Sequence, residues 1–320
     1  MRLCRFSDGD ITLAGFYDDE FVIPIDQASE MYCEEVGVEL LFANTTDLLE
    51  LLPPCGASYH AIRELASWVG DLGLHQRQEI ALPHDEVTLL TPIGSPGKIL
   101  MLAGNYASYV VERGGVAPVA DETFPYLFMK PPSTTLTHPG APIILPRVSP
   151  DYIDWECELG VVIGRRCRHV AERDALSYVA GYTVVNDISD RKFAPNPDRS
   201  PRENDKFFDW LHGKWHDTFC PIGPCISSAD SIQDPQSLAI RLEVNGQLRQ
   251  SGCTGQMIFT VAAVIAFLSR FVTLEPGDVI ATGTPSGVGS ASGTYLRPGD
   301  VVRASIRGIG VLENPVILED

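Results

Sequence analysis

Residues 151–164 read DYIDWECELGVVIG, and this stretch decides the fold. Its second half is a continuous apolar run that ends in glycine, which is typical of a buried β-strand. Side chains two residues apart lie on the same face of a strand, so we expect Glu156 and Glu158 to project together. Cys157 then points the other way, into the core. The stretch therefore predicts a strand that carries two carboxylates side by side.

Two carboxylates on one face repel each other unless a cation lies between them. A hard divalent cation such as Mg²⁺ binds carboxylate oxygens and keeps water ligands that a substrate can replace. Asp187, at the end of the apolar run VVNDIS (184–189), supplies a third acid whose burial is costly without a partner. A solvated strand face for the two glutamates and a turn-capping role for Asp187 remain alternatives, because spacing alone does not bring the three acids together.

Strand patterns dominate the chain on both sides of this stretch. We expect strands at 98–103, 126–130, 158–164, 182–188, 237–245, 278–282 and 301–306, and helices at 106–113 and 256–271. Few of these strands are separated by helices of crossover length, so a doubly wound parallel sheet is not favoured. We therefore predict a mainly β fold of the α+β class with a few peripheral helices.

The sequence pattern of the first 95 residues predicts a separate, smaller unit. Short strands are expected at 2–6, 12–17 and 21–25, and helical patterns at 43–52 and 57–72. The segment 91–98 contains two prolines and two glycines and is typical of a connector. We predict a small β-rich N-terminal domain at 1–95 and a larger domain at 96–320.

Composition excludes several classes of partner. The 320 residues include 24 Lys and Arg against 42 Asp and Glu, a formal net charge of −18 at pH 7. Such a surface should repel phosphate backbones and anionic lipids, so we expect no nucleic-acid or membrane partner. We also find no apolar run of the roughly 18–20 residues that span a membrane and no secretory signal, and expect a cytoplasmic protein. The eight cysteines contain no CxxC pair and are expected to be reduced thiols.

Several motifs, in the same order along the chain, resemble the fumarylacetoacetate hydrolase family. They are ECELGVVIG (156–164), NDIS (186–189), GKWHDTFCPIGP (213–224) and GDVIATGTPSGVG (277–289), supported by FMKPPS (128–133) and RPGDVV (297–302). The likeness covers about residues 98–318, and the N-terminal unit resembles the small domain that many members carry. It implies a β-rich sandwich or roll at 96–320 as the catalytic domain, and usually a homodimer.

The resemblance also implies a metal and a substrate class. Glu156, Glu158 and Asp187 would hold Mg²⁺ or Mn²⁺, with Ca²⁺ as a further possibility. Substrates of the family are 2-oxo and 2,4-dioxo acids, and the chain resembles two-domain acylpyruvate hydrolases, oxaloacetate decarboxylases and hydroxyheptadienedioate isomerases. A metal that chelates the oxo acid would polarise its carbonyl and stabilise the enolate through which all these reactions pass.

Further site residues are implied by the same resemblance. Lys214 matches the family's active-site lysine, whose ammonium would orient the substrate carboxylate or oxyanion. Lys130 in the FMKPPS match and Thr284 in the Gly-Thr-Pro turn are weaker candidates for substrate contact. Asn105 and Tyr106, which form the family's Asn-Tyr pair at the start of a lid, complete the expected substrate-binding set.

One departure from the family pattern bears on mechanism. Hydrolytic members follow the Asn-Tyr pair with a His and, three residues later, a Glu, and this dyad activates water. Here the segment NYASYVVE (105–112) keeps Glu112 but has Tyr109 in place of the His. A phenol, with an ordinary pKa of about 10, is a poor general base at neutral pH. We therefore expect Tyr109 and Glu112 to shape or gate the lid, and His212 or His216 could compensate for the missing His.

The sequence leaves three hypotheses about the function. The first is metal-dependent hydrolysis of a C–C bond in an acylpyruvate-like or fumarylacetoacetate-like acid. The second is an oxaloacetate-type decarboxylase or an isomerase or tautomerase, which needs no activated water. The third is a metal-binding paralogue with little turnover. The charged segment 195–209 is longer than in compact relatives, and an enlarged pocket for a bulkier substrate would fit it.

Overall fold

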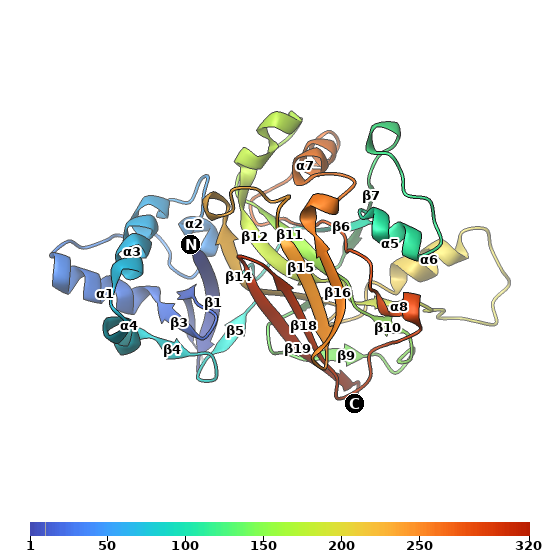
Figure 1. Ribbon diagram of the computed structural model, residues 1–320, viewed down its shortest axis with the longest axis horizontal. Coiled ribbons are helices and arrows are strands. Elements are labelled where there is room, and N and C mark those ends of the chain that lie inside the picture. Colours follow the sequence, from blue (N-terminus) through green and yellow to red (C-terminus); the bar gives the residue numbers. More distant parts are fainter. Residues whose placement is uncertain (10) are drawn as a thin grey trace.

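The computed structural model describes residues 1–9 and 11–320, and its centre is a large twisted β-sheet (Figure 1). In spatial order this sheet contains β4 (Leu82–Pro83), β3 (Phe21–Pro24), β2 (Ile11–Tyr17), β1 (Arg2–Asp8), β14 (Cys220–Ser228), β12 (Val179–Asn186), β11 (Cys157–Ile163), β17 (Val279–Ala281), β6 (Ile99–Ala103) and β7 (Tyr126–Lys130), with β5 (Thr88–Leu90) paired to β1 and β8 (Leu136–Thr137) paired to β14.

A second sheet packs against the middle of the first. Its strands, in order, are β16 (Gln247–Cys253), β15 (Ala239–Val244), β18 (Val301–Ile306), β19 (Gly310–Leu318) and β9 (Ile143–Leu145). Strands β11, β12 and β14 of the large sheet contact this second sheet, and every residue in the three strands is buried. The apolar runs in β11 and β12 follow from this position, because both faces of each strand are covered. The predicted α+β, mainly β fold is confirmed.

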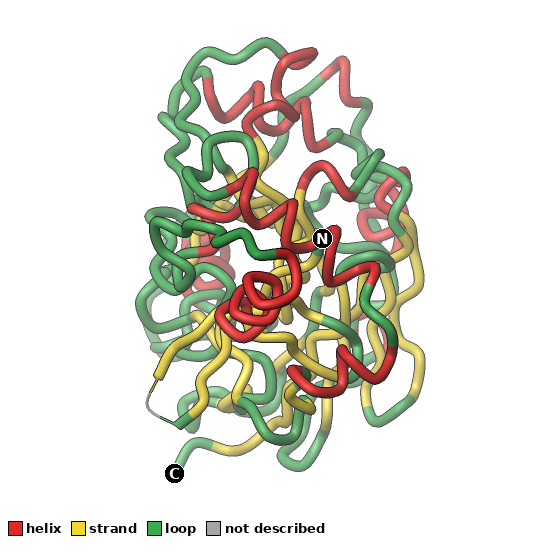
Figure 2. Tube along the Cα trace, turned by 90° about the vertical axis from the view of Figure 1, so that its left-hand side faces the viewer, coloured by secondary structure: helices red, strands yellow, loops and turns green. Residues whose placement is uncertain are grey.

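Helices occupy the periphery. The N-terminal segment contains α1 (Ile25–Val36), α2 (Leu48–Leu51), α3 (Tyr59–Asp71) and α4 (Leu74–Ile80), and the rest of the chain contains α5 (Ala107–Glu112), α6 (Asp205–His212), α7 (Val261–Ser269), α8 (Gly289–Ser292) and the short 3₁₀ segments Ala120–Glu122, Glu172–Tyr178, Ala229–Ser231 and Thr254–Gln256. Figure 1 shows α1–α4 at one end of the molecule and α5 and α6 at the other. Figure 2 looks onto the N-terminal end, with its helices in front of the strands.

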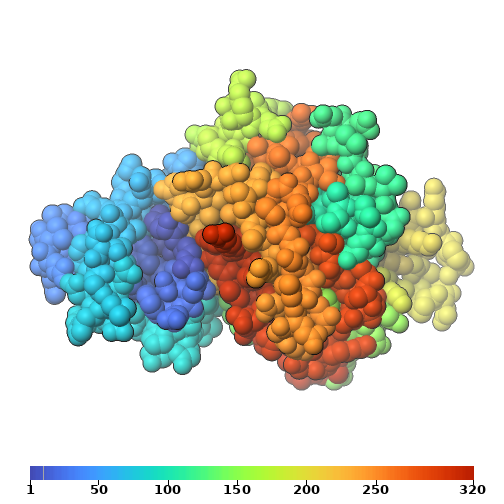
Figure 3. Space-filling view, in the orientation of Figure 1, coloured from blue at the N-terminus to red at the C-terminus, as the bar shows by residue number. Residues whose placement is uncertain are grey.

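The N-terminal strands extend the large sheet. Strand β1 pairs antiparallel with β14 through Arg2 opposite Ser227 and Leu3 opposite Ile226. The hydrophobic cluster beneath α1–α3 also includes Val162 and Ala180 of the central strands. In the space-filling view of Figure 3 the blue N-terminal residues pack directly against the orange and red strands of the C-terminal part. The division at residue 95 stays a prediction.

The expected secondary structure is largely present. The predicted strands at 2–6, 12–17 and 21–25 are β1–β3, whereas helix α1 begins at Ile25 and was not predicted. The predicted helix 256–271 begins later, as α7, because the side chain of Thr260 caps it by accepting a hydrogen bond from the N–H of Ala263. Within the described residues no helix is both long and apolar enough to cross a membrane. All eight cysteines are free, and Cys157 is buried in the core as expected.

Candidate active site

The three predicted acids converge where β11 begins and β12 ends. Glu156 precedes β11, Glu158 lies within it, and Asp187 follows β12 directly; antiparallel pairing places Cys157 opposite Asn186. One carboxylate oxygen of each acid lies within 4.8 Å of those of the other two, and all three side chains are buried. The alternative of a solvated strand face for the two glutamates is therefore wrong.

The donor set fits a hard divalent cation. Oε2 of Glu158 accepts a hydrogen bond from the N–H of Gly283 at 2.7 Å, but its buried Oε1 has no hydrogen-bond partner within residues 1–9 and 11–320. Burial and the charges of Asp187 and Glu156 raise the pKa of Glu158 well above its usual value. A cation bound to the three oxygens would offset this repulsion. Carboxylate oxygens are the ligands that Mg²⁺, Mn²⁺ and Ca²⁺ prefer.

Lys214 is hydrogen-bonded to two of the three acids. Its buried Nζ donates to Oδ2 of Asp187 at 2.6 Å, to Oγ of Ser189 at 2.7 Å and to Oε2 of Glu156 at 3.1 Å. Burial disfavours the charged amine, but the charges of Asp187 and Glu156 outweigh it and raise the pKa of Lys214 above its usual value. The site therefore holds a permanent ammonium beside the three carboxylates.

Lys130, at the end of β7, is buried beneath the same cluster. Its Nζ lies 2.6 Å from Oδ1 of Asp187 and donates to the carbonyl oxygens of Ile188, at 2.8 Å, and Phe219. Protein oxygens surround this ammonium, so it is placed to hold Asp187 and the turn that follows. Direct contact of Lys130 with substrate stays a prediction.

Tyr109 and Glu112 share the helix α5 but have different partners. The hydroxyl of Tyr109 donates to Oε1 of Glu156 at 3.4 Å. Burial, and then the charge of Glu156, raise the pKa of Tyr109, so the phenol keeps its proton at neutral pH. The carboxylate of Glu112 instead accepts a hydrogen bond from the N–H of Gly287, with N–O distances of 2.9 and 3.0 Å. A water-activating pair of these two residues is not assembled.

Asn105 connects three parts of the chain at the start of the lid. Its buried amide donates to the carbonyl oxygens of Thr282, at 2.8 Å, and Phe259, at 3.1 Å, and accepts from the N–H of Phe259 at 2.8 Å. The nitrogen and the oxygen of the Asn105 amide are thus both hydrogen-bonded to the main chain. A substrate contact, which stays a prediction, would have to replace one of these bonds.

Thr284 and Tyr106 lie next to the strand that carries the glutamates. The hydroxyl of Thr284 donates to the carbonyl of Cys157 at 2.8 Å and accepts from Nε2 of Gln250 at 2.8 Å. Tyr106 is fully buried, and its hydroxyl has no hydrogen-bond partner in the described residues. Burial raises the pKa of Tyr106, with the charge of Glu158 as a second cause. Of these two residues, Tyr106 keeps a free polar atom near the acids.

Sequence reasoning missed Arg191 and Asp154. The buried guanidinium of Arg191 donates to Oε1 of Glu156 and, at 2.8 Å, to Oδ2 of Asp154. Asp154 in turn accepts hydrogen bonds from the N–H groups of Gly289, at 2.6 Å, and Ser290, at 2.9 Å. Burial would lower the pKa of Arg191, but Glu156 and Asp154 outweigh it and raise the pKa. The sequence offered one signal for Asp154, its position as an aspartate inside the short apolar segment DYIDW (151–155).

The space above the acids is small. A cavity of about 20 Å³, room for roughly one water molecule, is lined by Leu102, Ala103, Gly104, Tyr109, Phe128, Glu156, Trp210, Lys214 and Thr284. Entry of an oxo acid therefore requires movement of α5 or α6. The flanking histidines do not line this cavity: Nε2 of His216 lies 3.7 Å from Oδ2 of Asp190, and the ring of His212 packs against Trp215.

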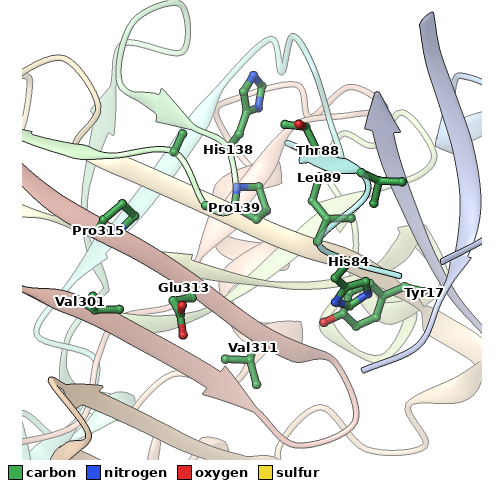
Figure 4. Close-up of a pocket in the computed structure, with 13 residues that line it drawn as sticks. Tyr17, His84, Thr88, Leu89, His138, Pro139, Val301, Val311, Glu313 and Pro315 are labelled. Atoms are coloured by element: carbon green, nitrogen blue, oxygen red, sulfur yellow. The ribbon is translucent and has the colours of Figure 1, made fainter. Parts of the chain in front are cut away.

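A larger hollow lies elsewhere, between the N-terminal segment and β19 (Figure 4). Its volume is about 670 Å³. Tyr17 and His84 stack on one wall with ring centroids 5.2 Å apart, and Glu313 lies on the opposite wall. The predicted site residues do not line it, so the acid cluster is the candidate active site.

Residues 98–317 match the family described as fumarylacetoacetate (FAA) hydrolase C-terminal. The chain is 40% identical, over 297 residues covering 91% of it and 88% of the relative, to the mitochondrial oxaloacetate tautomerase of Xenopus laevis. It is 42% identical, over 228 residues covering 70% and 75%, to the 2,4-didehydro-3-deoxy-L-rhamnonate hydrolase of Sphingomonas sp. (strain SKA58). The Xenopus protein is named as mitochondrial, and the cytoplasmic location of this chain stays a prediction.

Two solved structures of enzymes are also similar to this chain. Maleylpyruvate hydrolase from Sphingobium sp. SYK-6, in complex with manganese(II) ion and pyruvate, is similar with a TM-score of 0.71 and 29% identity, over 100% of both chains. Fumarylacetoacetate hydrolase from Exiguobacterium antarcticum is similar with a TM-score of 0.74 and 31% identity, again over 100% of both chains.

Proposed function

The chain is an enzyme of the fumarylacetoacetate hydrolase family, and from that premise we propose that it enolises a 2-oxo acid at a divalent metal held by Glu156, Glu158 and Asp187. The observation that carries the proposal is the convergence of these three buried carboxylates with the ammonium of Lys214 beside them. When bound, Mg²⁺ or Mn²⁺ supplies the charge that stabilises the developing enolate oxygen of the chelated acid.

The remaining groups bind the acid and move its proton. Lys214 presents a cation beside the position of the substrate carboxylate, where a chain of net charge −18 needs local positive charge to bind an anion. The single proton of the Tyr109 hydroxyl is now donated to Oε1 of Glu156. On turning to the substrate, this hydroxyl can give its proton to the carbonyl oxygen and, as the phenolate, take up the proton that leaves carbon 3. Closure of α5 over the acid excludes water from the enolate.

Tautomerisation is the outcome that the geometry supports best. It needs only a proton to leave carbon 3 of the oxo acid and one to arrive at the carbonyl oxygen, or the reverse. Hydrolysis also needs an activated water, and Glu112, which would share that task with a His, bonds to Gly287 instead. The name of the Xenopus relative, an oxaloacetate tautomerase, supports the same choice.

Hydrolysis of a C–C bond in a 2,4-dioxo acid is the second candidate. It is supported by the two relatives named as hydrolases of maleylpyruvate and of 2,4-didehydro-3-deoxy-L-rhamnonate. Decarboxylation of oxaloacetate passes through the same enolate and would use the same residues. These outcomes differ in their products and can be separated in one experiment.

Proton NMR of the purified enzyme with Mg²⁺ makes that separation, with oxaloacetate and acetylpyruvate offered in turn and EDTA as control. We expect faster enol–keto conversion of oxaloacetate than free Mg²⁺ gives, without new products. Acetate and pyruvate from acetylpyruvate would show hydrolysis, and pyruvate from oxaloacetate would show decarboxylation. A spectrum without any metal-dependent change would contradict the proposal and leave the paralogue with little turnover.

We also propose, from the family resemblance, that the chain forms a homodimer. Light scattering coupled to gel filtration tests this directly. A mass of twice 34.9 kDa is expected, and a mass of 34.9 kDa would contradict it.

A further inference from the structure

An apolar groove adjoins the acid cavity. It lies where the edge strand β7 approaches α6 and the end of α7, at the end of the molecule opposite the N-terminal helices (Figure 1). Its volume is about 640 Å³, within the range of small-molecule sites. The lining is uncharged and mostly aromatic, and consists of Ala103, Phe124, Pro125, Tyr126, Leu127, Phe207, Trp210, Phe267 and Phe271.

The groove and the acid cavity share two wall residues, Ala103 and Trp210. The indole of Trp210 packs edge-on against the ring of Phe128, with centroids 5.1 Å apart. The ammonium of Lys214 lies 5.1 Å from the centroid of that same Phe128 ring. Trp210 of α6 therefore stands between the two spaces, and a movement of α6 that admits an oxo acid would also join the groove to the acids.

The rings of the groove are held in place but remain open to solvent. Phe124 stacks on Phe267 with centroids 6.0 Å apart, and Phe207 packs on Trp210 at 5.8 Å. Phe124, Phe207 and Phe271 are nevertheless 57%, 55% and 56% exposed. A contiguous exposed apolar surface of this kind is typical of a binding site, because its burial against a ligand is favourable.

We propose that this groove binds an apolar substituent of the substrate, so that, among acids longer than the four-carbon oxaloacetate, those with an alkyl or aryl tail are preferred over those with a distal carboxylate. The inference rests on the proposed function of the acid site, which supplies the position of the head. A second carboxylate would lose its hydration among aromatic rings, and the lining offers no cation to replace it. The segment 195–209 contains Phe207 and is followed directly by Trp210, and these two α6 residues form one wall.

Calorimetric titration of the Mg²⁺-loaded enzyme tests the proposal with three oxamates, which present one chelating head and are not turned over. They are oxamate, N-hexyloxamate and N-(5-carboxypentyl)oxamate. A fully buried methylene contributes about fourfold in affinity, so we expect the hexyl compound to bind at least about 30-fold more tightly than oxamate in a partly open groove. The carboxypentyl compound should bind no more tightly than oxamate.

Two neighbouring residues of α6 provide a matched pair of variants. Phe207→Asp places a charge in the groove and should remove most of the preference for the hexyl tail. Phe208→Asp, at a neighbouring position that is 46% exposed but does not line the groove, should keep that preference. Phe271→Asp tests the opposite wall and should act like Phe207→Asp, which guards against a local folding defect in α6.

The outcomes separate the two proposals. If oxamate itself does not bind, the proposed function fails and this inference fails with it. If oxamate binds but the hexyl tail adds nothing, or the tail preference survives both groove variants, only the groove proposal is overturned. Conversion of a dimer to monomers by Phe207→Asp, without any tail preference in the unmodified enzyme, would show that a second copy of the chain covers the groove.

Discussion

At the scale of single residues, Glu158 decides whether the acid cluster is a metal site. Among the described residues its Oε1 has neither a hydrogen bond nor an ion pair, whereas Oδ1 of Asp187 is paired with Lys130. The charges of Asp187 and Glu156 disfavour the ionised form of Glu158. Glu158→Gln keeps an oxygen for the N–H of Gly283 and removes only the charge. We therefore expect the variant to fold and to lose the metal.

Thermal unfolding with and without metal measures this loss. A ligand at 100 times its Kd stabilises the native state by about 2.7 kcal/mol, so Mg²⁺ should raise the Tm of the unmodified enzyme by several degrees, and EDTA should reverse the effect. The Tm of Glu158→Gln should not respond to either. An equal rise in both proteins would place the metal somewhere other than on these acids.

Tyr109 is the second residue for which the structure gives a specific prediction, here about the rate of the reaction. Tyr109→Phe removes the hydroxyl that donates to Glu156 at the cavity, and loss of a positioned proton donor typically lowers the rate about 10²- to 10⁴-fold. We expect kcat to fall in this range while the metal-induced rise in Tm is kept. Steady-state kinetics of enol–keto conversion provide the test, and an unchanged kcat would remove Tyr109 from the mechanism.

The sequence allowed part of this site to be predicted. Strand alternation placed Glu156 and Glu158 on one face, and the end of the next apolar run suggested Asp187 as a third acid. The motif resemblance added Lys214, and the structure brings all four residues to the same place. Arg191 was missed because its link to the site depends on the pairing of β10 (Ile153–Asp154) with β13 (Ser189–Asp190). Pairing between such short and distant segments has no signal in a single sequence.

At the scale of secondary-structure elements, Asp154 joins β10 to the start of α8. It accepts hydrogen bonds from two N–H groups there and pairs with the buried Arg191. Asp154→Ala leaves these donors and part of a buried charge without partners, so we expect a loss of about 3 kcal/mol in the free energy of unfolding. Urea denaturation measures it.

Asp151 supplies the control for that measurement. It also pairs with an arginine, Arg297, at 3.0 Å, but the two side chains are 65% and 59% exposed. Exposed ion pairs contribute at most about 1 kcal/mol, so Asp151→Ala should cost much less than Asp154→Ala. Equal losses in the two variants would contradict the structural role given to the buried pair.

Helix α5 gives a prediction that separates two roles of Glu112. If Glu112 only fastens α5 to the loop at Gly287, Glu112→Gln should keep most of the activity, because the amide oxygen still accepts the N–H. Glu112→Ala should raise KM and speed hydrogen exchange in 107–112. A general base would behave differently: Glu112→Gln would then abolish activity while hydrogen exchange stayed unchanged.

The secondary structure was predictable where burial is complete and less so elsewhere. Continuous apolar runs gave β11, β12 and β17, because both faces of these strands are covered. Helix α1 was missed, although its buried residues Ile25 and Ala28 follow helical spacing, because the preceding strand runs directly into it. Surface elements carry weaker patterns since only one face is constrained.

At the scale of the whole molecule, the N-terminal segment is expected to be needed for folding of the rest. Val162, Ala180 and Ile226 of the central strands are buried under N-terminal residues, and β1 pairs with β14. Removal of residues 1–95 would expose this apolar surface and a strand edge, so we expect the fragment 96–320 to aggregate. Gel filtration and circular dichroism test this. A monodisperse fragment with the circular dichroism of folded β-structure would show that 96–320 is an independent domain.

The fold class could be predicted from the whole sequence, whereas the shape of the substrate space could not. The small cavity and the apolar groove depend on how β7, α6 and α7 approach one another across long stretches of chain. Residues such as Phe207 and Phe271 look like ordinary surface positions until those elements are brought together. Only the long segment 195–209 gave a sign that this wall differs from that of compact relatives.

If the three buried acids support metal-dependent enolisation, the enzyme should catalyse deuterium exchange at carbon 3 of 2-oxobutanoate. This acid has no bond that hydrolysis or β-decarboxylation would break, so proton NMR in D₂O reports enolisation alone. We predict that the enzyme with Mg²⁺ exchanges these protons faster than Mg²⁺ alone, and that EDTA or Glu158→Gln removes the effect. Exchange no faster than with Mg²⁺ alone, or undiminished in Glu158→Gln, would show that these acids do not support enolisation.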